Sequence, residues 1–373
     1  MSDDLPAIIV DNGTFQIKAG FAGDDLPRAI CRCVVGHPKE GGDDYLVGEN
    51  AEEKSASMNL KHPLERGFVY NWEDMMKVWS HVFYNELRVT VEEHPVIMTE
   101  PPLNPKEHRE YLTSLMFESW NVPAFYVATP AVLCLYASGR TTGLVVQSGD
   151  SISHVVPVIE GCMLADGVVP FEIAGNDLTD FMEKLLAQRG YAESDYGFQT
   201  LAGRKVVRDV KEKLCRVAND LGRAMEEYDA SPEPRTYCHP DPRLDMALGT
   251  ECYRCPEALF NPVLISKEGP SMHLAILHAI ERVDPGFKKD LWSNVILSGG
   301  NTMFPGLPDR LLKELGELVP EMKDHIKVVA SPERRYLPWV GASVLTSLGS
   351  FEDMWVTRAD YDAEGPTAVR KCR

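Results

Sequence analysis

The chain has 373 residues, of which 44% are apolar and 25% are charged, and its 38 basic and 56 acidic side chains give a formal net charge of -18. This composition is that of an ordinary globular protein and excludes a disordered or fibrous chain. The acidic excess argues against a nucleic-acid backbone or an anionic membrane surface as a direct partner.

The targeting and redox features of the sequence are those of an intracellular protein. No segment approaches the run of about 20 apolar residues that a membrane span needs. The start, MSDDLPAIIV, lacks the basic region that begins a secretory signal. Nine cysteines is an odd number, in a chain large enough to build a core without disulfides. We therefore expect free thiols in a reducing compartment.

Short apolar runs alternate along the chain with segments of helical periodicity, which predicts an α/β fold. The predicted strands are Ala7–Val10, Val96–Met98, Leu144–Val146 and Val295–Leu297. The predicted helices are Trp72–Leu87, Pro105–Trp120, Asp177–Gln188, Arg204–Asp220, Met272–Arg282 and Pro308–Leu318, and a further helix begins at Thr129-Pro130. Two segments rich in glycine, proline or charge, His37–Asp44 and Asp229–Pro242, are predicted to be exposed loops.

Two segments repeat one plan, in which an apolar strand ends in a polar turn with a glycine and a second strand follows. The turns are Asp11-Asn12-Gly13-Thr14 and Gln147-Ser148-Gly149-Asp150, and a third glycine turn lies in Leu297–Gly306. Glycine lets successive backbone N–H groups converge on an anion. Each turn alone is also what an ordinary hairpin contains. Together they favour a phosphate-binding cleft between two similar halves.

Several longer segments lie in a fixed order along the chain, namely DNGTFQIKAGFAGDDLPRA, FYNELRV, PLNPKEHRE, LYASGRTTG, VRDVKEKLC, RCPEALF and LSGGNTM. In these and other segments, over essentially the whole length, the chain resembles the actin family, that is, actin and the actin-related proteins. The resemblance implies a duplicated α/β fold of the ribonuclease H-like type, with ATP or ADP and a divalent cation in a cleft between two lobes. The implied first lobe comprises 1–137 and 332–373, with a small insert at about 33–62, and the second comprises 138–331, with an insert at about 175–266.

The resemblance also assigns the nucleotide contacts residue by residue. Thr14 and Lys18 would contact the terminal phosphates, with Gly13 supplying a backbone N–H, and Gly149 and Asp150 would form the opposing turn. The residues implied around the ribose and adenine are Gly175, Arg208, Lys211, Glu212, Gly299, Gly300, Thr302, Phe304 and Arg335.

The implied cation site differs from that of actin. The family uses acidic side chains to organise a hydrated Mg²⁺ or Ca²⁺, and here Asp11 and Asp150 would act through water. The partner of Asp11 on the second turn is Gln147. A neutral amide can bind cation-bound water but adds no Coulombic attraction, so we expect weakened cation binding.

The implied water-orienting residues also differ. Pro130 stands where actin has a glutamine, and its side chain has no hydrogen-bonding group, whereas His154 is retained. Phe15 and Ser151 stand where actin has glycines, and we expect them to crowd the phosphates. The expectation is therefore nucleotide binding with slow or absent hydrolysis. A simpler interpretation is also open for both residues. Pro130 could be present because proline begins a helix well, and Gln147 could be a hydrogen-bonded polar residue beside a strand.

The surfaces that join actin subunits are altered as well. The segment HPKEGGDDYLVG is shorter and more charged than the corresponding actin loop, and the plug segment between filament strands is the polar Ser266–Gly269. Self-polymerisation is therefore expected to be weakened. A groove for an amphipathic partner helix is implied at Tyr136, Gly139, Leu345, Leu348 and Met354, although these residues could equally pack the lobe.

Three functional hypotheses follow. The first is a cytoskeletal, actin-like interaction or regulatory subunit that binds nucleotide. Its partners would be actin-binding or complex-forming proteins, or actin itself, in the cytoplasm, with the nucleus as an alternative. The second is a filament-forming ATPase with rearranged catalytic water, and the third is a nucleotide-free scaffold.

The cysteines admit one further interpretation. Cys252 and Cys255, with Cys238-His239 upstream, have a spacing found in zinc sites, but buried free thiols are the favoured reading. Cys372, next to the end of the sequence, is expected to be exposed and reactive.

Overall fold

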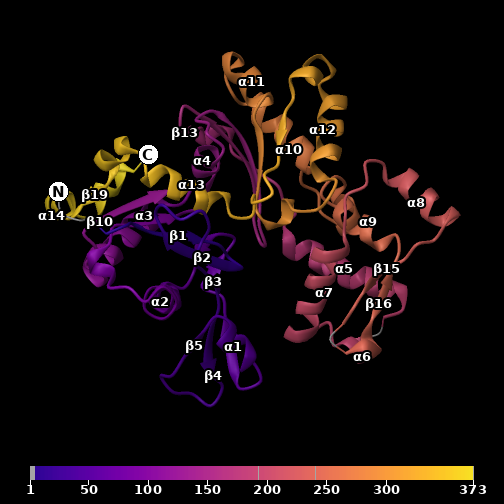
Figure 1. The fold of residues 1–373 in the computed structure, drawn as a ribbon, viewed down its shortest axis with the longest axis horizontal. Helices are drawn as coiled ribbons and strands as arrows, with labels where there is room; N and C mark the ends of the chain where they lie inside the picture. Colours follow the sequence, from indigo (N-terminus) through magenta and orange to yellow (C-terminus); the bar gives the residue numbers. More distant parts are fainter. Residues whose placement is uncertain (1–4, 192, 240, 373) are drawn as a thin grey trace. The chain divides into compact units, whose positions relative to one another are not determined.

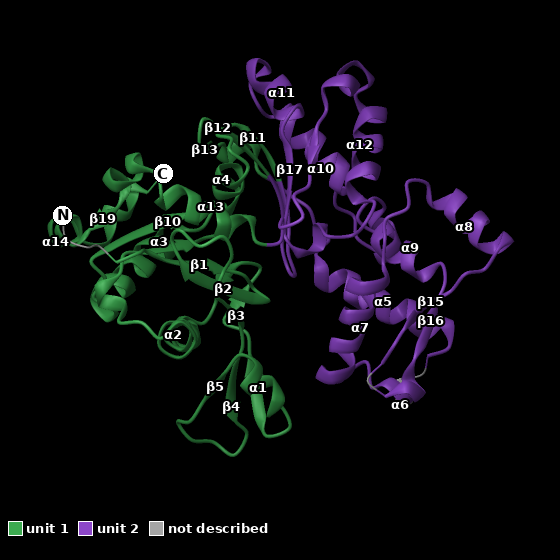
Figure 2. Cartoon of the chain, in the orientation of Figure 1, with its two compact units in different colours: residues 1–145, 156–168, 336–373 green, residues 146–155, 169–335 purple. Residues whose placement is uncertain are grey.

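The computed structural model describes residues 5–191, 193–239 and 241–372. The chain divides into two compact units, which Figure 2 shows in different colours. Unit 1 comprises Met1–Val145, Val156–Val168 and Tyr336–Arg373, and unit 2 comprises Val146–Val155 and Val169–Arg335. The two units are defined by which residues pack together. The expected lobes are instead defined by the duplicated fold that the family resemblance implies. The lobe boundaries therefore stay a prediction.

Unit 1 is built around a six-stranded sheet, most of whose strands are labelled in Figure 1. In spatial order its strands are β19 (Val356–Thr357), β10 (Ala124–Ala128), β9 (Val96–Thr99), β1 (Ile8–Asn12), β2 (Gln16–Phe21) and β3 (Ala29–Arg32). β9 runs parallel to both β1 and β10, while β1, β2 and β3 form an antiparallel meander. The parallel pairs leave β1 and β9 buried, which explains their unbroken apolar runs.

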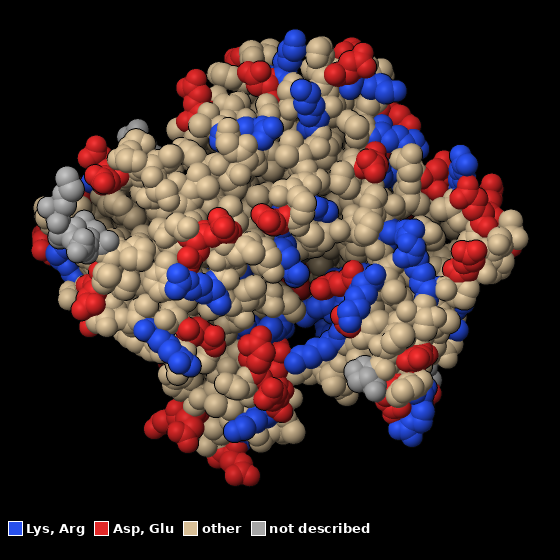
Figure 3. Space-filling view, in the orientation of Figure 1, with Lys and Arg blue, Asp and Glu red and all other residues tan. Residues whose placement is uncertain are grey.

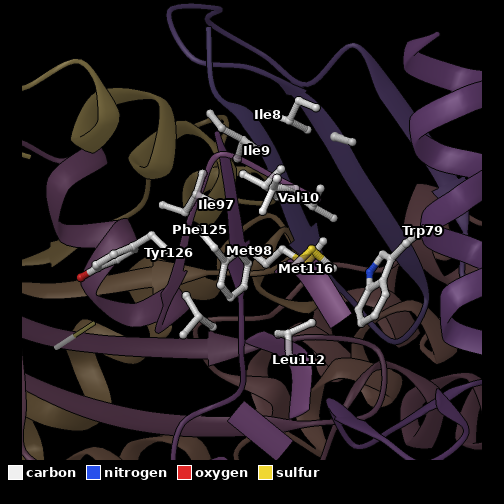
Figure 4. Close-up of a cluster of buried hydrophobic side chains, with 14 of the residues drawn as sticks. Ile8, Ile9, Val10, Trp79, Ile97, Met98, Leu112, Met116, Phe125 and Tyr126 are labelled. Atoms are coloured by element: carbon white, nitrogen blue, oxygen red, sulfur yellow. The ribbon is translucent and has the colours of Figure 1, made fainter. Parts of the chain in front are cut away.

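The core of this sheet joins β1, β9 and β10 to two helices, as Figure 4 shows. The labelled side chains are Ile8, Ile9, Val10, Trp79, Ile97, Met98, Leu112, Met116, Phe125 and Tyr126, all of them buried. Because these strands carry the first glycine turn at the end of β1, the core fixes where that turn lies.

The remaining elements of unit 1 are helices and small sheets. The helices are α1 (Glu49–Glu53), α2 (Trp72–Ser80), α3 (Lys106–Ser114), α4 (Pro130–Ala137), α13 (Leu337–Thr346) and α14 (Arg358–Glu364), and π-helical turns at His81–Leu87 and Leu115–Ser119 extend α2 and α3. β4 (Val35–Pro38), β5 (Leu46–Val47) and β6 (Met58–Lys61) form one small sheet, β7 (Leu64–Glu65) and β8 (Phe68–Val69) form a hairpin, and 3₁₀ turns span Val91–Glu93, Ala165–Gly167, Gly349–Met354 and Gly365–Lys371.

Unit 2 holds most of a second sheet. Its strand order is β13 (Cys162–Met163), β12 (Ser153–Ile159), β11 (Gly143–Ser148), β17 (Val295–Ser298) and β18 (Val328–Val329), and β14 (Val169–Pro170) pairs with β12. β11 and β12 carry the chain from unit 1 to unit 2 and back, and the second glycine turn joins them inside unit 2.

The helices of unit 2 follow in chain order. They are α5 (Gly175–Arg189), α6 (Glu193–Tyr196), α7 (Leu201–Leu214), α8 (Leu221–Ala230), α9 (Glu251–Glu257), α10 (Met272–Glu281), α11 (Pro285–Trp292) and α12 (Leu307–Leu318). β15 (Arg235–Tyr237) pairs with β16 (Met246–Leu248), and 3₁₀ turns span Pro242–Leu244, Pro262–Ile265, Gly300–Thr302 and Pro320–His325.

These elements confirm the four predicted strands and the predicted helix positions, with one helix end wrong. The helix predicted over Arg204–Asp220 ends at Leu214, and Cys215 is already extended. Beyond it the backbone turns away to bond with other elements, since Arg216 N–H donates to the Cys252 carbonyl and Val217 N–H to that of Pro305. Long-range contacts thus override the local helical pattern.

The expectation that Cys372 is exposed is wrong. Its side chain packs into the unit 1 core with only 1% of its surface exposed, and burial raises the pKa of its thiol to about 11. A neutral, enclosed thiol is a poor nucleophile.

The surface shown in Figure 3 carries acidic and basic side chains interspersed with one another. Among the described residues no helix combines the length and the apolar character needed to cross a bilayer.

Candidate phosphate-binding turns

The first glycine turn connects β1 to β2 in unit 1. The two strands pair Asp11 with Lys18, and the Lys18 Nζ lies 2.7 Å from Asp11 Oδ2. The Thr99 hydroxyl donates to the other carboxylate oxygen at 3.0 Å. A Cβ on Gly13 would lie 2.5 Å from the Gln16 carbonyl oxygen, so only glycine fits there. The turn thus holds a cation and a carboxylate in a fixed arrangement.

Neighbouring elements anchor this turn. The Asn12 N–H donates to Thr99 Oγ1 at 2.8 Å, and Trp79 Nε1–H donates to Asn12 Oδ1 at 2.9 Å. From the hairpin of β7 and β8, the Gly67 N–H donates to Thr14 Oγ1 at 3.2 Å. The Asn12 and Thr14 side chains are therefore used to hold the turn in place.

Phe15 lies against a buried ion pair. The Arg32 guanidinium stands 3.3 Å from the centre of the Phe15 ring and donates from Nη1 to the Phe15 carbonyl at 3.2 Å. The same guanidinium donates to Glu52 Oε1 through Nε and Nη2, at 3.0 and 2.9 Å. We call Phe15, Arg32 and Glu52 the Phe15 triad. It joins the turn to β3 and α1.

The second glycine turn, between β11 and β12, packs on the start of α5 within unit 2. The Gly175 N–H donates to the Gly149 carbonyl at 2.9 Å, and the Asn176 N–H to the Asp150 carbonyl at 2.7 Å. A Cβ on Gly175 would come within 3.3 Å of Asp150 Cα, so glycine allows this close approach. The positive end of a 15-residue helix dipole therefore meets the turn.

Polar side chains from α5 and α7 surround this second turn. Asp150 accepts from Asn176 Nδ2 at 2.7 Å and from Arg208 Nη2 at 3.4 Å. Lys211 Nζ donates to the Gly175 carbonyl at 2.7 Å and to Thr179 Oγ1 at 2.9 Å. Burial lowers the pKa of Lys211, because desolvation disfavours the charged ammonium.

The third glycine turn follows β17 and is tied to the second by hydrogen bonds. Gly299 has φ +95°, and a Cβ there would lie 2.2 Å from the Ser148 carbonyl oxygen. Asn301 Nδ2 donates to Ser148 Oγ at 2.9 Å, and Ser148 Oγ lies 2.7 Å from Ser153 Oγ. The Thr302 hydroxyl donates to the Gly299 carbonyl at 2.7 Å. The second and third glycine turns therefore lie in contact with each other within unit 2.

The other predicted nucleoside residues differ in exposure. Gly300, Glu212 and Arg335 are exposed, whereas Phe304 keeps only 5% of its surface exposed and belongs largely to the protein interior. Arg334 is buried, and it donates through Nε and Nη2 to the Thr302 carbonyl.

His154 and Gln147 face each other across the second turn. His154 Nε2 lies 3.0 Å from Gln147 Oε1. Because an amide oxygen can only accept, Nε2 carries the proton and donates it. Burial lowers the pKa of His154 to about 4, so the ring is neutral at pH 7. Pro130, the other replaced position, is buried in the first turn of α4.

A family model described as Actin matches residues 2–373. The chain belongs to the actin family. The match covers essentially the whole chain and confirms the expected actin-like α/β fold.

The residues present in this actin-family chain fit the nucleotide that the family binds. Ser151 Oγ and Asn301 Oδ1 are buried without a hydrogen-bond partner among the described residues, one on each of the linked turns in unit 2. Gly13 and Gly299 allow the tight packing of their turns, where a Cβ would clash with the carbonyls of Gln16 and Ser148. Such turns can offer donors and acceptors to phosphates and a nucleoside.

The described residues contain no group of three or more His, Cys, Asp or Glu side chains that could hold a metal ion directly. Cys252 and Cys255 are buried, and the Cys255 thiol donates to the Leu178 carbonyl at 3.3 Å, while Cys238 is exposed. Asp11 and Asp150, the two predicted cation residues, belong to units 1 and 2 respectively.

The predicted partner groove belongs to unit 1, where α4 packs tightly on α13. A Cβ on Gly341 would lie 1.8 Å from the Leu133 carbonyl oxygen, so this contact requires glycine. Leu345 is only 4% exposed and packs the core, whereas Leu348 is 41% exposed. Tyr136 and Met354 are half-buried against the core, and Gly139 is exposed at φ +65°.

Sequence reasoning missed the side chains that hold the turns in place. They are Arg32, Glu52, Thr99, Ser148, Ser153, Asn176, Asn301 and Arg334. Most act on residues far away in the chain, as Asn301 does on Ser148, and no local spacing signals such a contact.

Proposed function

We propose that this actin-family chain binds ATP or ADP, with Mg²⁺ or Ca²⁺, on the three glycine turns. Asp11, Gly13, Thr14 and Lys18 would serve the phosphates and cation from the first lobe, and Gly149 and Asp150 from the second. The ion pair of Lys18 with Asp11 and the packing of α5 on the second turn support this assignment. The remaining nucleoside contacts would be Gly175, Arg208, Lys211, Glu212, Gly299, Gly300, Thr302, Phe304 and Arg335.

We propose that hydrolysis is slow or absent, and the main support for this is the contact between His154 and Gln147. The Nε2–H of His154 donates to Gln147 Oε1 at 3.0 Å, so that N–H is not available to orient an attacking water. At the same position an aspartate would have supplied negative charge for the cation, which the amide does not. Pro130 adds no donor or acceptor of its own. A water that is not positioned for attack and a cation that is held less tightly would together lower the rate of phosphoryl transfer.

The biological role proposed is that of a cytoskeletal interaction or regulatory subunit with weakened self-polymerisation. The loop His37–Asp44 is exposed over most of its length and carries Lys39, Glu40, Asp43 and Asp44. Charges at such a tip disfavour burial in an interface between copies. Partners would include actin-binding or complex-forming proteins, or actin itself, in the cytoplasm or, as an alternative, the nucleus.

The test is to identify what co-purifies with the protein and then to measure turnover and assembly. Nucleotide would be released by denaturation and identified, and phosphate release and pelleting would be followed beside actin as a positive control. Bound nucleotide, little phosphate release and protein in the supernatant are expected. Purified protein that neither contains nor binds nucleotide would refute the proposal in favour of a scaffold.

A filament-forming ATPase with rearranged catalytic water is the second candidate. Retention of a neutral, buried His154 favours it, because that ring could still contact water if Gln147 moves aside. Rapid phosphate release with pelleted filaments would establish this candidate. Loss of that turnover in His154→Ala would then identify the ring as the group that orients water.

A further inference from the structure

The turn between β11 and β12 and the strand ends that flank it contain three serines, and the hydroxyls of two of them are hydrogen-bonded within the fold. Ser153 Oγ donates to the Ile173 carbonyl at 2.7 Å, and it lies 2.7 Å from Ser148 Oγ, which also accepts from Asn301. The third is Ser151, whose Oγ is buried without a partner in the described part of the chain. The hydroxyl without a hydrogen-bond partner among the described residues is thus the one at the tip of the turn.

Two hydrogen bonds fix the backbone of the turn on either side of Ser151. The Gly149 N–H donates to the Ile152 carbonyl at 2.9 Å, on the far side of Ser151. Asp150 is tied through its carbonyl to the Asn176 N–H. A buried hydroxyl without a hydrogen-bond partner lowers the stability of the folded state by about 1–3 kcal/mol. A hydroxyl at this place therefore indicates a ligand that can accept a hydrogen bond from it.

The charges around the turn favour an anionic acceptor. The N-terminus of α5 meets the turn at Gly175, and Arg208 of α7 donates to Asp150 in the turn. Lys211 of α7 donates to the Gly175 carbonyl beside the turn. The one carboxylate in the turn, that of Asp150, already accepts from Asn176 and Arg208. A phosphate oxygen suits both this positive potential and the hydroxyl donor.

We propose that the Ser151 hydroxyl is an additional phosphate ligand of this chain, donating a hydrogen bond to an oxygen of the β- or γ-phosphate of a bound nucleotide. The inference rests on the proposed function and deepens it. It reverses the sequence-based expectation that Ser151 crowds the phosphates in place of the family's glycine. Ser151 is then a specificity-determining residue, which separates nucleotides with two or three phosphates from nucleoside monophosphates.

The two views of Ser151 predict opposite effects of two substitutions, Ser151→Ala and Ser151→Gly. Affinities of the purified full-length protein for ATP, ADP and AMP would be measured by calorimetry at fixed Mg²⁺. If the hydroxyl binds phosphate, both variants lose about 10-fold in affinity for ATP or ADP and none for AMP, since hydrogen bonds to charged groups contribute at this scale. If Ser151 crowds the site, Ser151→Gly binds ATP more tightly than the wild type.

Ser231→Ala is the matched control, because Ser231 is an exposed serine of the same unit, at the end of α8. Its affinities should equal those of the wild type. Equal or tighter binding of ATP and ADP by both Ser151 variants would overturn the inference and leave the proposed function standing. Absence of binding by the wild type would overturn the proposed function and the inference together. Ser151→Gly keeps the test decisive if Ser151→Ala fails to fold, since it cannot introduce a clash.

Discussion

Lowering the pH should destabilise the protein through one buried ring, that of His154. Burial lowers the pKa of this imidazole from 6.5 to about 4. In the unfolded chain the same ring takes up a proton near pH 6.5. As the pH falls from 6.5 to 4, the unfolded state therefore binds a proton that the folded state does not, and stability is lost through that window.

The size of the effect follows from the difference between the two pKa values. His154 should cost the folded state about 2 kcal/mol of stability between pH 6.5 and pH 5, and about 3 kcal/mol once the pH is below 4. Above about pH 7.5 it contributes almost no pH dependence, because the ring is then neutral in both states. The ring is fully buried, so solvent screening does not reduce these values.

The assay is urea unfolding at pH 7 and pH 5, for the wild type and for His154→Gln. The variant lowers stability at pH 7 by removing packing and a hydrogen bond, but it also removes the titrating group. Its loss of stability between the two pH values should therefore be smaller than that of the wild type by about 2 kcal/mol. Equal losses in the two proteins, or a His154 resonance that titrates near pH 6.5 in NMR spectra, would refute this reasoning.

Three further predictions concern the turns. Pro130→Gln combined with Gln147→Asp should raise phosphate release and Mg²⁺ affinity together, because it restores a water-orienting amide and a carboxylate; no change in either would show that residues such as Phe15 dominate. Arg32→Met should destabilise unit 1 by about 3–5 kcal/mol in urea unfolding, because it removes the cation that faces the buried Glu52 carboxylate. Arg32→Met with Glu52→Leu should recover most of that loss, and a double variant as unstable as the single one would argue against the ion pair as the cause. Gly299→Ala should lower stability by more than about 2 kcal/mol through its positive φ and the clash with the Ser148 carbonyl. Gly300→Ala, where a Cβ meets open space, should keep the stability of the wild type, and equal melting curves for the two variants would contradict the steric argument.

Local patterns predicted the framework of this protein well because local physics determines it. The apolar runs of β1, β9, β11 and β17 have no alternative to burial in a sheet, and glycines at strand ends mark the turns. Local patterns failed where distant residues decide. Cys215 ends α7 because the chain beyond it bonds to α9 and to the turn after β17, and Cys372 is covered by the unit 1 core.

The candidate site divides in the same way. Resemblance supplied Asp11, Lys18 and Asp150, because each lies in a segment that matches the family motif. It gave no sign that Gln147 would bond to His154, or that Ser151 would be left with an unpaired hydroxyl, because both depend on side-chain geometry across the turn. The chemical role of a residue that differs from the family, such as Gln147 or Ser151, can therefore be inferred only when the positions of its neighbours are known.

The Phe15 triad has a consequence for any attempt to place a glycine at position 15. Replacing Phe15 by glycine would take the ring from the face of the Arg32 guanidinium, which would keep its bonds to Glu52 and to the carbonyl of residue 15. The effect of a change at one of these three positions therefore depends on which residues occupy the other two. A glycine at position 15 is thus best introduced together with changes at positions 32 and 52.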